Sequence, residues 1–418
     1  MSLIKSRFFF NISTVDIFKN IILKLFFNLK KKKIENQIKK KLKNYFPSSN
    51  FYFFSHGRSA FYFILINLKK KTSKRKIIIN SFTLYEMINM IIYAGFIPVL
   101  IDLEKNSFET SIKKEIRKHQ KDLAAIVITH LNGINRDVIE VKKFIKKKGI
   151  YLIEDAAVAF GSTINRKFAG GIGDYGIVSL NIMKNITTIT GGILIDNNKK
   201  VKLIDQESIF KNEAKLDILK KSIFVLILQF LNSKFIFLFF YQFIKFSHKY
   251  KLNFFLKKYR TDFILNIRSK IPDQYLNLLS SVQTNVLSNQ FLSLKKKQLN
   301  RIRKSKYYYD NLKKNNNILF PQKIFNYKNI FIDFPIIIKR RKKELFNYLM
   351  NNNIDVKGYY YSNCGNNIIY KRKCYISKIN NSTDISKKVM MLPVNENFKT
   401  EDQDRVIFHI NKFIYNNK

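Results

Sequence analysis

The sequence predicts an α/β protein: a mostly parallel β-sheet sandwiched by helices, followed by a smaller C-terminal α+β domain. From Ser55 onward, short apolar segments alternate with amphipathic segments long enough for helices. This alternation is typical of parallel strands joined by crossover helices, which cover both faces of the sheet. The chain has 418 residues, which is too long for one small core and suits a large domain plus a smaller one.

The elements of the large domain follow in order along the chain. Four buried strands are predicted, at Lys76–Asn80, Ile97–Asp102, Ala124–Thr129 and Ile150–Glu154. Helices are predicted at Leu84–Ala94 and Val138–Lys148, closed by Gly95 and Gly149. A long helical pattern begins near residue 285. The smaller domain is predicted from a strand at 331–339, a helix at 342–352 and a tail helix after Thr400.

These elements predict three parts of the chain. Residues 1–47 form a basic helical leader that ends at Pro47. Residues 48–310 form the large domain, interrupted at about 206–265 by an apolar helical insertion. Residues 311–418 form the small domain.

The charge of the chain is strongly positive. Lys and Arg number 77 against 29 Asp and Glu, a formal net charge of +48. Such a charge favours an anionic partner, either nucleic acid or the acidic surface of a membrane. Drift towards AT-rich codons is the competing explanation, because Lys, Asn, Ile and Phe are all abundant and Trp is absent. The lysines are dispersed among Asn and Ile and form no recognisable module, so we do not expect nucleic-acid binding.

The cysteine content points to a reducing compartment. Cys364 and Cys374 are the two cysteines of the chain, and neither lies in a metal-like cluster. The amino terminus lacks the continuous apolar stretch and small-residue cleavage site of a signal peptide. We therefore expect a cytoplasmic protein without a bound metal.

Two segments raise the possibility of contact with the inner face of a membrane. Within residues 1–30, Ile17, Ile21, Leu25 and Leu29 recur at a spacing of four among lysines. This spacing predicts a basic amphipathic helix that lies either on a membrane surface or against the body of the protein. Ser222–Phe246 is rich in Phe and fringed by Lys, but Lys234 divides it into stretches shorter than the ~20 residues of a spanning helix. It predicts either an interfacial hairpin on an anionic membrane or a pair of buried core helices.

The residues with the strongest chemical signal are Asp155 and Lys184. Asp155 ends a buried strand, where side chains usually face a ligand crevice. Lys184 follows a glycine-rich turn, and Ser179 precedes it by five positions. Pyridoxal 5'-phosphate requires these groups: a carboxylate for its ring nitrogen, a lysine for the Schiff base and hydroxyls for its phosphate. A second phosphate-binding turn is predicted at Gly57, Arg58 and Ser59, which begin an apolar helix.

Six segments in register resemble the DegT/DnrJ/EryC1/StrS family of sugar aminotransferases, which have fold type I of the pyridoxal-phosphate enzymes. They are GRSA at 57–60, NSFTLYEMINMIIYAGFIPVLIDLE at 80–104, THLNGINRD at 129–137, EDAA at 154–157, GDYGIVSLNIMKN at 173–185 and MMLPVNENFKTEDQDRVI at 390–407. Each is weak alone, but together they span roughly 350 residues.

The resemblance implies a role for each matched residue. Lys184 would bind the cofactor and move protons as general base and acid, and Asp155 would pair with the ring nitrogen. Ser179 and the turn from Gly57 to Ser59 would hold the phosphate. Such enzymes transfer an amino group, usually from glutamate, to a keto-sugar on a nucleotide carrier. They generally act as homodimers with sites at the subunit boundary.

The chain departs from the family pattern near the cofactor. Val158 replaces the usual Gln or His after EDAA. The aromatic ring that often stacks on the cofactor falls at Leu84, so we predict Tyr85 in its place. His130 is a candidate cofactor contact or, equally, a structural histidine. These departures leave two alternatives open: a membrane-associated scaffold without activity, or another reaction of the same cofactor on a sugar.

Overall fold

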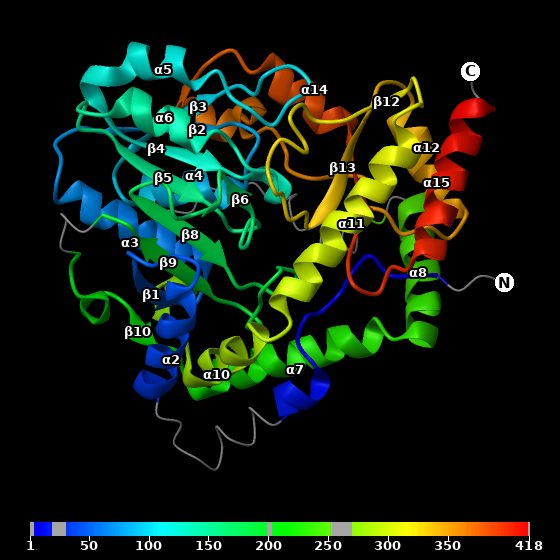
Figure 1. The fold of residues 1–418 in the computed structure, drawn as a ribbon, viewed down its shortest axis with the longest axis horizontal. Coiled ribbons are helices and arrows are strands. Elements are labelled where there is room, and N and C mark those ends of the chain that lie inside the picture. The colour runs from blue at the N-terminus through cyan, green and yellow to red at the C-terminus, as the bar shows by residue number, and fades with distance from the viewer. Residues whose placement is uncertain (1–3, 19–30, 199–202, 251, 253–269, 417–418) are drawn as a thin grey trace.

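The computed structural model describes residues 4–18, 31–198, 203–250, 252 and 270–416 (Figure 1). Its central feature within these residues is a ten-stranded sheet in the order β10-β11-β1-β9-β8-β5-β4-β2-β3-β14. The strands are β1 (Asn50–Phe54), β2 (Lys76–Asn80), β3 (Ile97–Ile101), β4 (Leu123–Thr129), β5 (Tyr151–Asp155), β8 (Tyr175–Ser179), β9 (Gly192–Asp196), β10 (Lys211–Asn212), β11 (Asn277–Leu278) and β14 (Tyr375–Ile376).

The sheet is mostly parallel, as the sequence predicts. Strands β14, β3, β2, β4, β5 and β8 pair in parallel, whereas β9 runs antiparallel to both β8 and β1. Asp155 ends β5 beside Thr129 of β4, so the candidate carboxylate lies at the carboxyl edge of the parallel strands. Strand β14 comes from residues beyond 311 and adds to the large sheet, so the expected boundary between the domains is crossed there.

Helices cover both faces of the sheet, because its strands are apolar on both sides. Ile77 and Ile79 pack under the helices of one face, while Ile78 packs under those of the other. The first face carries α3 (Gly57–Lys69) and α4 (Tyr85–Tyr93). The second carries α2 (Lys31–Lys43), α5 (Ile112–His119), α6 (Val138–Ile145) and α10 (Ser281–Gln290). The predicted α/β fold is therefore confirmed.

The smaller unit is built around an antiparallel sheet of β12 (Ile318–Leu319), β13 (Asp333–Ile338) and β15 (Val389–Pro393). Its helices are α11 (Leu294–Leu312), α12 (Lys342–Asn351), α13 (Ile368–Lys371), α14 (Asn380–Lys388) and α15 (Thr400–Tyr415). A two-stranded ribbon, β6 (Thr163–Ile164) with β7 (Lys167–Phe168), lies outside both sheets. The α+β character predicted for the carboxyl-terminal part is confirmed.

The single long helix predicted from residue 285 is wrong. The chain forms α10, breaks after Gln290 and resumes as α11 at Leu294. The break allows the two helices to pack into different hydrophobic cores. Phe291 packs near Phe160 of the large unit. Tyr308 and Leu312 of α11 are buried in the small unit.

The leader differs from the predicted continuous helix. Its last part is helical: α2 buries Ile38 and Leu42 against the large unit. Residues 4–12, however, are not helical. The carbonyls of Phe8 and Ile12 accept hydrogen bonds from the side chains of Asn232 and Gln229, so the segment is held by tertiary bonds. Of the predicted amphipathic stripe, Ile17 is buried, and Ile21, Leu25 and Leu29 lie outside the described residues.

The apolar insertion forms two helices, α7 (Lys215–Leu231) and α8 (Lys234–Lys249), which meet at 89°. Within the described residues, no one helix is long and apolar enough to cross a membrane, and these two meet that criterion only as a bent pair. Val225 of α7 is buried beside Ile189 and Val286 of the large unit. Tyr241 of α8 is buried in the small unit and donates a hydrogen bond to the Ile354 carbonyl (3.0 Å).

We predict that the end of the leader is part of the core. Leu42→Ala removes a fully buried side chain from the contact of α2 with the large unit, so it should lower the free energy of unfolding by about 2–4 kcal/mol. Lys40→Ala, on the exposed side of the same helix, is the control and should change it by less than about 0.5 kcal/mol. Urea unfolding measures both. Equal stability of the two variants would show that α2 is not packed in solution.

A pH-dependent contribution to stability should come from Asp196 of β9. Burial raises its pKa to about 6, against the hydrogen bonds from Asn198 and Asn50. The folded state therefore binds more protons than the unfolded state between pH ~4 and 6, and the free energy of unfolding falls as pH rises through this window. Between pH ~4 and ~7, the free energy of unfolding of the wild type should fall by about 1 kcal/mol relative to that of Asp196→Asn, whose side chain does not titrate. This figure allows for partial solvent screening. Asp310→Asn, on an exposed helix face, is the control for urea titrations at both pH values.

Candidate active site

Asp155 lies at the carboxyl edge of the sheet and is buried, with 6% of its surface exposed. Burial raises the pKa of its carboxyl group, and the Ala157 N–H (3.1 Å from Oδ1) and the charge of Lys184 oppose that rise. Lys184 therefore lies close enough to act on Asp155 electrostatically. The structure brings together the two residues for which the sequence predicts the chemistry.

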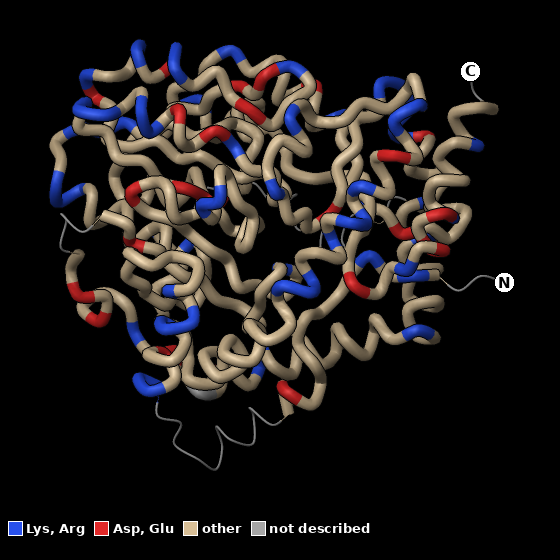
Figure 2. Tube along the Cα trace, in the orientation of Figure 1, with Lys and Arg blue, Asp and Glu red and all other residues tan. Residues whose placement is uncertain are grey.

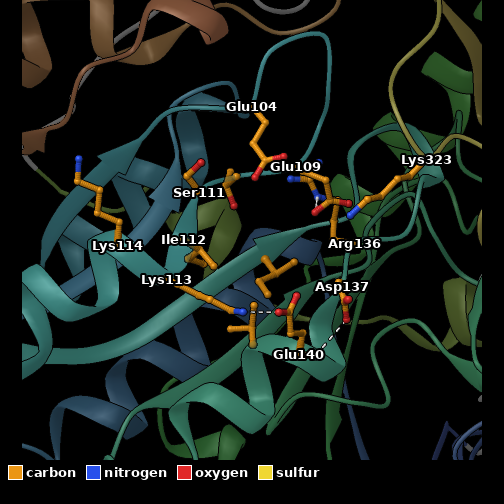
Figure 3. Close-up of a pocket in the computed structure, with 13 residues that line it drawn as sticks. Glu104, Glu109, Ser111, Ile112, Lys113, Lys114, Arg136, Asp137, Glu140 and Lys323 are labelled. Atoms are coloured by element: carbon orange, nitrogen blue, oxygen red, sulfur yellow. Dashed lines mark hydrogen bonds and ion pairs between the residues drawn. The ribbon is translucent and has the colours of Figure 1, made fainter.

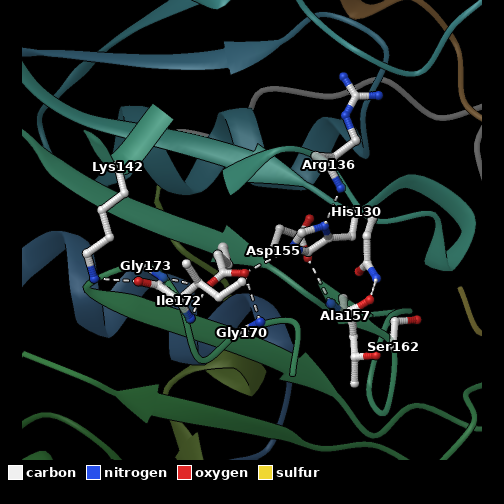
Figure 4. Close-up of polar contacts among 12 residues, drawn as sticks. His130, Arg136, Lys142, Asp155, Ala157, Ser162, Gly170, Ile172 and Gly173 are labelled. Carbon is white, nitrogen blue, oxygen red and sulfur yellow. Dashed lines mark hydrogen bonds and ion pairs between the residues drawn. The ribbon is translucent and has the colours of Figure 1, made fainter. Parts of the chain in front are cut away.

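His130 and Glu154, the residue before Asp155, form a fully buried pair, and Figure 4 draws His130 with its polar contacts. His130 Nε2 lies 3.0 Å from Glu154 Oε2, and His130 Nδ1 accepts the Arg136 N–H (3.2 Å). This arrangement assigns the ring proton to Nε2, which donates it to Glu154. Because both ring nitrogens are engaged, the geometry favours the structural alternative for His130. Its contact with a cofactor stays a prediction.

Glu154 also organises the glycine-rich turn that leads towards Lys184. Its carboxylate accepts hydrogen bonds from the backbone N–H groups of Gly170 (2.9 Å), Ile172 (2.6 Å) and Gly173. Burial alone would raise the pKa of Glu154, but these bonds and His130 hold it below its usual value. The turn is thus fixed to β5 by a charged group.

The predicted phosphate turn meets Ser179, which is more than a hundred residues away in sequence. Gly57 is the first residue of α3, and a Cβ placed on it would lie 3.2 Å from the Ser179 Cβ. The amino terminus of a helix presents unpaired N–H groups, and here a serine hydroxyl lies beside it. This combination fits a phosphate group.

Three other predicted cofactor residues have contacts of their own. Arg58 Nη1 donates a hydrogen bond to the Tyr275 hydroxyl (2.8 Å) and lies 3.7 Å from Glu86. Ser59 is fully buried, and its hydroxyl has no hydrogen-bond partner in the described part of the chain. Tyr85 begins α4 half-buried. Direct contact of these three with a cofactor stays a prediction.

The smaller unit also contributes to the site. Burial raises the pKa of Asp333, at the start of β13, while the charges of Lys357, Arg301, Arg7 and Lys184 lower it. The Tyr360 hydroxyl accepts the Asn132 N–H (2.8 Å), and its pKa is raised by burial and, more weakly, by Asp155. Sequence reasoning missed Asp333 and Tyr360, because only the packing of the two units brings them near Lys184 and Asp155.

Asn11 is a further residue that sequence reasoning missed. Its side-chain nitrogen donates a hydrogen bond to the Lys184 carbonyl (2.9 Å), and its own carbonyl accepts one from Gln290 (2.9 Å). The non-helical leader therefore fixes the backbone of the candidate catalytic lysine. No motif marks Asn11 in the sequence.

A separate polar pocket lies beside α5 and α6 (Figure 3). Arg136 on its wall is buried and forms an ion pair with Glu109 (3.2 Å), and burial lowers the pKa of the Arg136 guanidinium. None of the predicted site residues lines this pocket. In the described ranges, no three His, Cys, Asp or Glu side chains are grouped to hold a metal, and Cys364 and Cys374 form no disulfide.

Comparison with known families decides the identity of the fold. The model of the DegT/DnrJ/EryC1/StrS aminotransferase family matches residues 28–217 and 275–411. The chain belongs to this family. The match confirms the resemblance inferred from the six motifs. It leaves out residues 1–27, 218–274 and 412–418, and the first two of these segments include the non-helical leader and most of α7 and α8.

Curated relatives match the chain over part of its length. GDP-perosamine synthase from Vibrio cholerae is 31% identical over 143 residues, 34% of this chain and 38% of that protein. UDP-4-amino-4,6-dideoxy-N-acetyl-beta-L-altrosamine transaminase from Campylobacter jejuni subsp. jejuni serotype O:23/36 (strain 81-176) is 32% identical over 145 residues, 33% of this chain and 39% of that protein. The matches thus span about two fifths of these relatives.

Solved structures confirm the fold over nearly the whole chain. Helicobacter pylori PseC, an aminotransferase involved in the biosynthesis of pseudoaminic acid, superposes with a TM-score of 0.72 at 17% identity and covers 96% of each chain. E. coli GDP-4-keto-6-deoxy-D-mannose-3-dehydratase, with bound hydrated pyridoxal phosphate, gives a TM-score of 0.73 at 15% identity and covers 98% of this chain and 99% of that one. The protein therefore has fold type I of the pyridoxal-phosphate enzymes.

We predict that the Glu154 carboxylate is essential for stability. In Glu154→Gln, an amide NH2 group replaces one carboxylate oxygen among neighbours that are all donors, so the free energy of unfolding should fall by about 2–4 kcal/mol. Glu140→Gln removes a surface carboxylate that pairs with Lys113, and should cost less than about 1 kcal/mol. Chemical denaturation followed by circular dichroism measures both. A Glu154→Gln protein as stable as the control would refute the buried network.

Proposed function

We propose that this protein is a pyridoxal-phosphate-dependent aminotransferase that transfers an amino group, from glutamate, to a keto-sugar on a nucleotide carrier in polysaccharide or amino-sugar biosynthesis. The observation that carries the proposal is the placement of Asp155 and Lys184 within electrostatic reach of each other at the carboxyl edge of the sheet. The substrate class comes from the relatives, which include nucleotide-sugar aminotransferases by name.

The residues at this edge fit pyridoxal phosphate. Asp155 is buried and its pKa is raised, so a protonated ring nitrogen beside it would restore the charged form. The amino terminus of α3 and Ser179 lie together at the place where a phosphate would be held. When bound, the cofactor supplies an electron sink for the carbon atom that loses its proton.

Each side chain of the candidate site has a separate role in the proposed reaction. Lys184 would hold the cofactor through its Nζ atom, which as a general base and acid would accept and return a proton. Asp155 would pair with the positive charge of the ring. Asn11 and the turn fixed by Glu154 keep the Lys184 backbone in place. Asp333 and Tyr360 bring the small unit to the same site.

We also propose that the enzyme is a cytoplasmic homodimer, as the family resemblance implies. Among the alternatives, dehydration of a sugar is disfavoured by Lys184, because that branch of the family usually carries histidine there. A scaffold without activity is supported by Val158 and Leu84, which differ from the family pattern. It is disfavoured by the retention of Asp155 and Lys184 in the proximity that the chemistry needs.

The first test is the spectrum of the purified protein with added pyridoxal phosphate. The wild type should show a Schiff-base band, and borohydride should fix the cofactor on the peptide that contains Lys184. Lys184→Ala should lose the band and reduce transamination by at least about a thousandfold. Lys167→Ala, an exposed lysine of β7, is the control and should keep both.

The outcomes separate the alternatives. Full turnover by Lys184→Ala would refute the assignment of the lysine. A wild type with neither a band nor a borohydride adduct would favour the scaffold.

A further inference from the structure

The helices α7 and α8 each bury one face and expose another that is equally apolar. On α7, Ile223, Phe224, Ile227 and Phe230 are exposed, with Phe230 at 64%. On α8, Phe235, Phe239 and Phe246 are exposed, with Phe239 at 74%. With Phe243, which is also exposed, the α8 residues recur every three or four positions, and on α7 Ile223, Ile227 and Phe230 do the same with Phe224 at their edge, so each set lies along one side of its helix. Exposed clusters of large apolar side chains mark interaction surfaces.

The charges around these side chains are almost all positive. Between residues 215 and 249 the chain contains six lysines and one acid, Asp217. Lys234 lies at the bend, next to Phe235, while Lys220 and Lys249 lie towards the outer ends of the two helices and are exposed. Aromatic side chains bordered by lysines are typical of helices that lie in the interface of an anionic membrane.

We propose that the exposed faces of α7 and α8, hereafter the docking face, bind side-on to the surface of an anionic lipid bilayer. The proposal concerns a surface away from the candidate cofactor residues and does not depend on the proposed activity. The docking face lies almost wholly within residues 218–274, which the family model does not match. It is therefore an addition to the common fold.

The packing of the two helices decides how they meet the bilayer. Val225 of α7 and Phe237, Tyr241 and Ile244 of α8 are buried against the body of the protein. Because these contacts cover one side of each helix, the proposal places both helices along the surface of the bilayer. Only the opposite side, which carries Phe230, is available to enter the interface.

Charge distinguishes a bilayer from a second copy of this chain. A symmetric contact places the same surface of each copy against the other. Two docking faces would bring together twelve lysines and two aspartates, in chains that each carry a net charge of +48. Repulsion opposes this contact, whereas anionic headgroups neutralise the same lysines.

The leader continues the docking face and connects it to the site. Thr14 Oγ1 donates a hydrogen bond to Gln229 of α7 (3.1 Å), and the neighbouring Val15 and Phe18 are more than half exposed. Three residues earlier, Asn11 binds the Lys184 carbonyl. The leader and the α7–α8 segment, both outside the family match, are thus in contact and connect the proposed membrane surface to the candidate catalytic lysine.

Flotation of the full-length protein with vesicles tests the proposal. The wild type should float with phosphatidylcholine vesicles that contain 30% phosphatidylserine, and at least ten times less with phosphatidylcholine alone. Raising the salt concentration should weaken the binding. Phe230→Gln, Phe235→Gln and Phe239→Gln in one variant should reduce binding at least tenfold. The matched control replaces three exposed apolar residues elsewhere, Leu292→Gln, Ile368→Gln and Phe408→Gln, and should bind as the wild type does.

Several outcomes would overturn the proposal. A wild type that does not float with the anionic vesicles refutes it without any variant. Equal binding by the wild type and the triple-Phe variant would assign the attraction to general basicity and not to the docking face. Failure to float, together with a triple-Phe variant that sediments as a smaller species than the wild type, would identify a second copy as the occupant.

Discussion

The buried carboxylate of Glu154 is the constraint on which the geometry of the site depends. A charge removed from water is costly unless hydrogen bonds replace its solvation. Here the replacements come from two elements: His130, just after β4, and the N–H groups of Gly170, Ile172 and Gly173. One side chain thus ties β5 to the neighbouring strand and to the turn before β8. Asp155 follows Glu154 directly, so the same network fixes its position.

The cost of such a network explains why Asp155 and Glu154 behave differently although they are adjacent in sequence. Glu154 is satisfied within the protein, and its pKa is held low in spite of burial. Asp155 accepts the N–H of Ala157, and its pKa is raised. The first carboxylate therefore supports the structure. The raised pKa of the second supports the proposal that it pairs with the positive charge of a cofactor ring.

The sequence predicted those parts of the structure that local patterns determine. Apolar strands and glycine-closed helices gave the sheet and its covering helices, because burial on both faces leaves a continuous apolar signal. Asp155, Lys184, Ser179 and Gly57 were found because the family motifs preserve their spacing.

The remaining features arise from contacts between distant segments. Arg58 meets Tyr275 and Glu86, and Asp333 approaches Lys184, only when the chain has folded. Residues 4–12 of the leader, predicted to be helical, are not, because the carbonyls of this segment accept hydrogen bonds from the side chains of Gln229 and Asn232, and a local helix pattern does not include such distant contacts. The break before α11 also depends on distant contacts. The sequence pattern is continuous there, but the residues on either side of the break pack into different cores.

The net charge of the chain indicates a particular binding surface only when it is considered together with the exposed apolar side chains. Lys and Arg are distributed along the whole chain trace, on the sheet, the helices and the small unit alike (Figure 2). Basicity of this kind attracts anions everywhere and selects no single surface. The exposed Phe side chains of α7 and α8 add a short-range apolar attraction at one place. A bilayer that offers both headgroup charge and an apolar interior would therefore bind this face in preference to the rest, whether the lysines arose by codon drift or by selection.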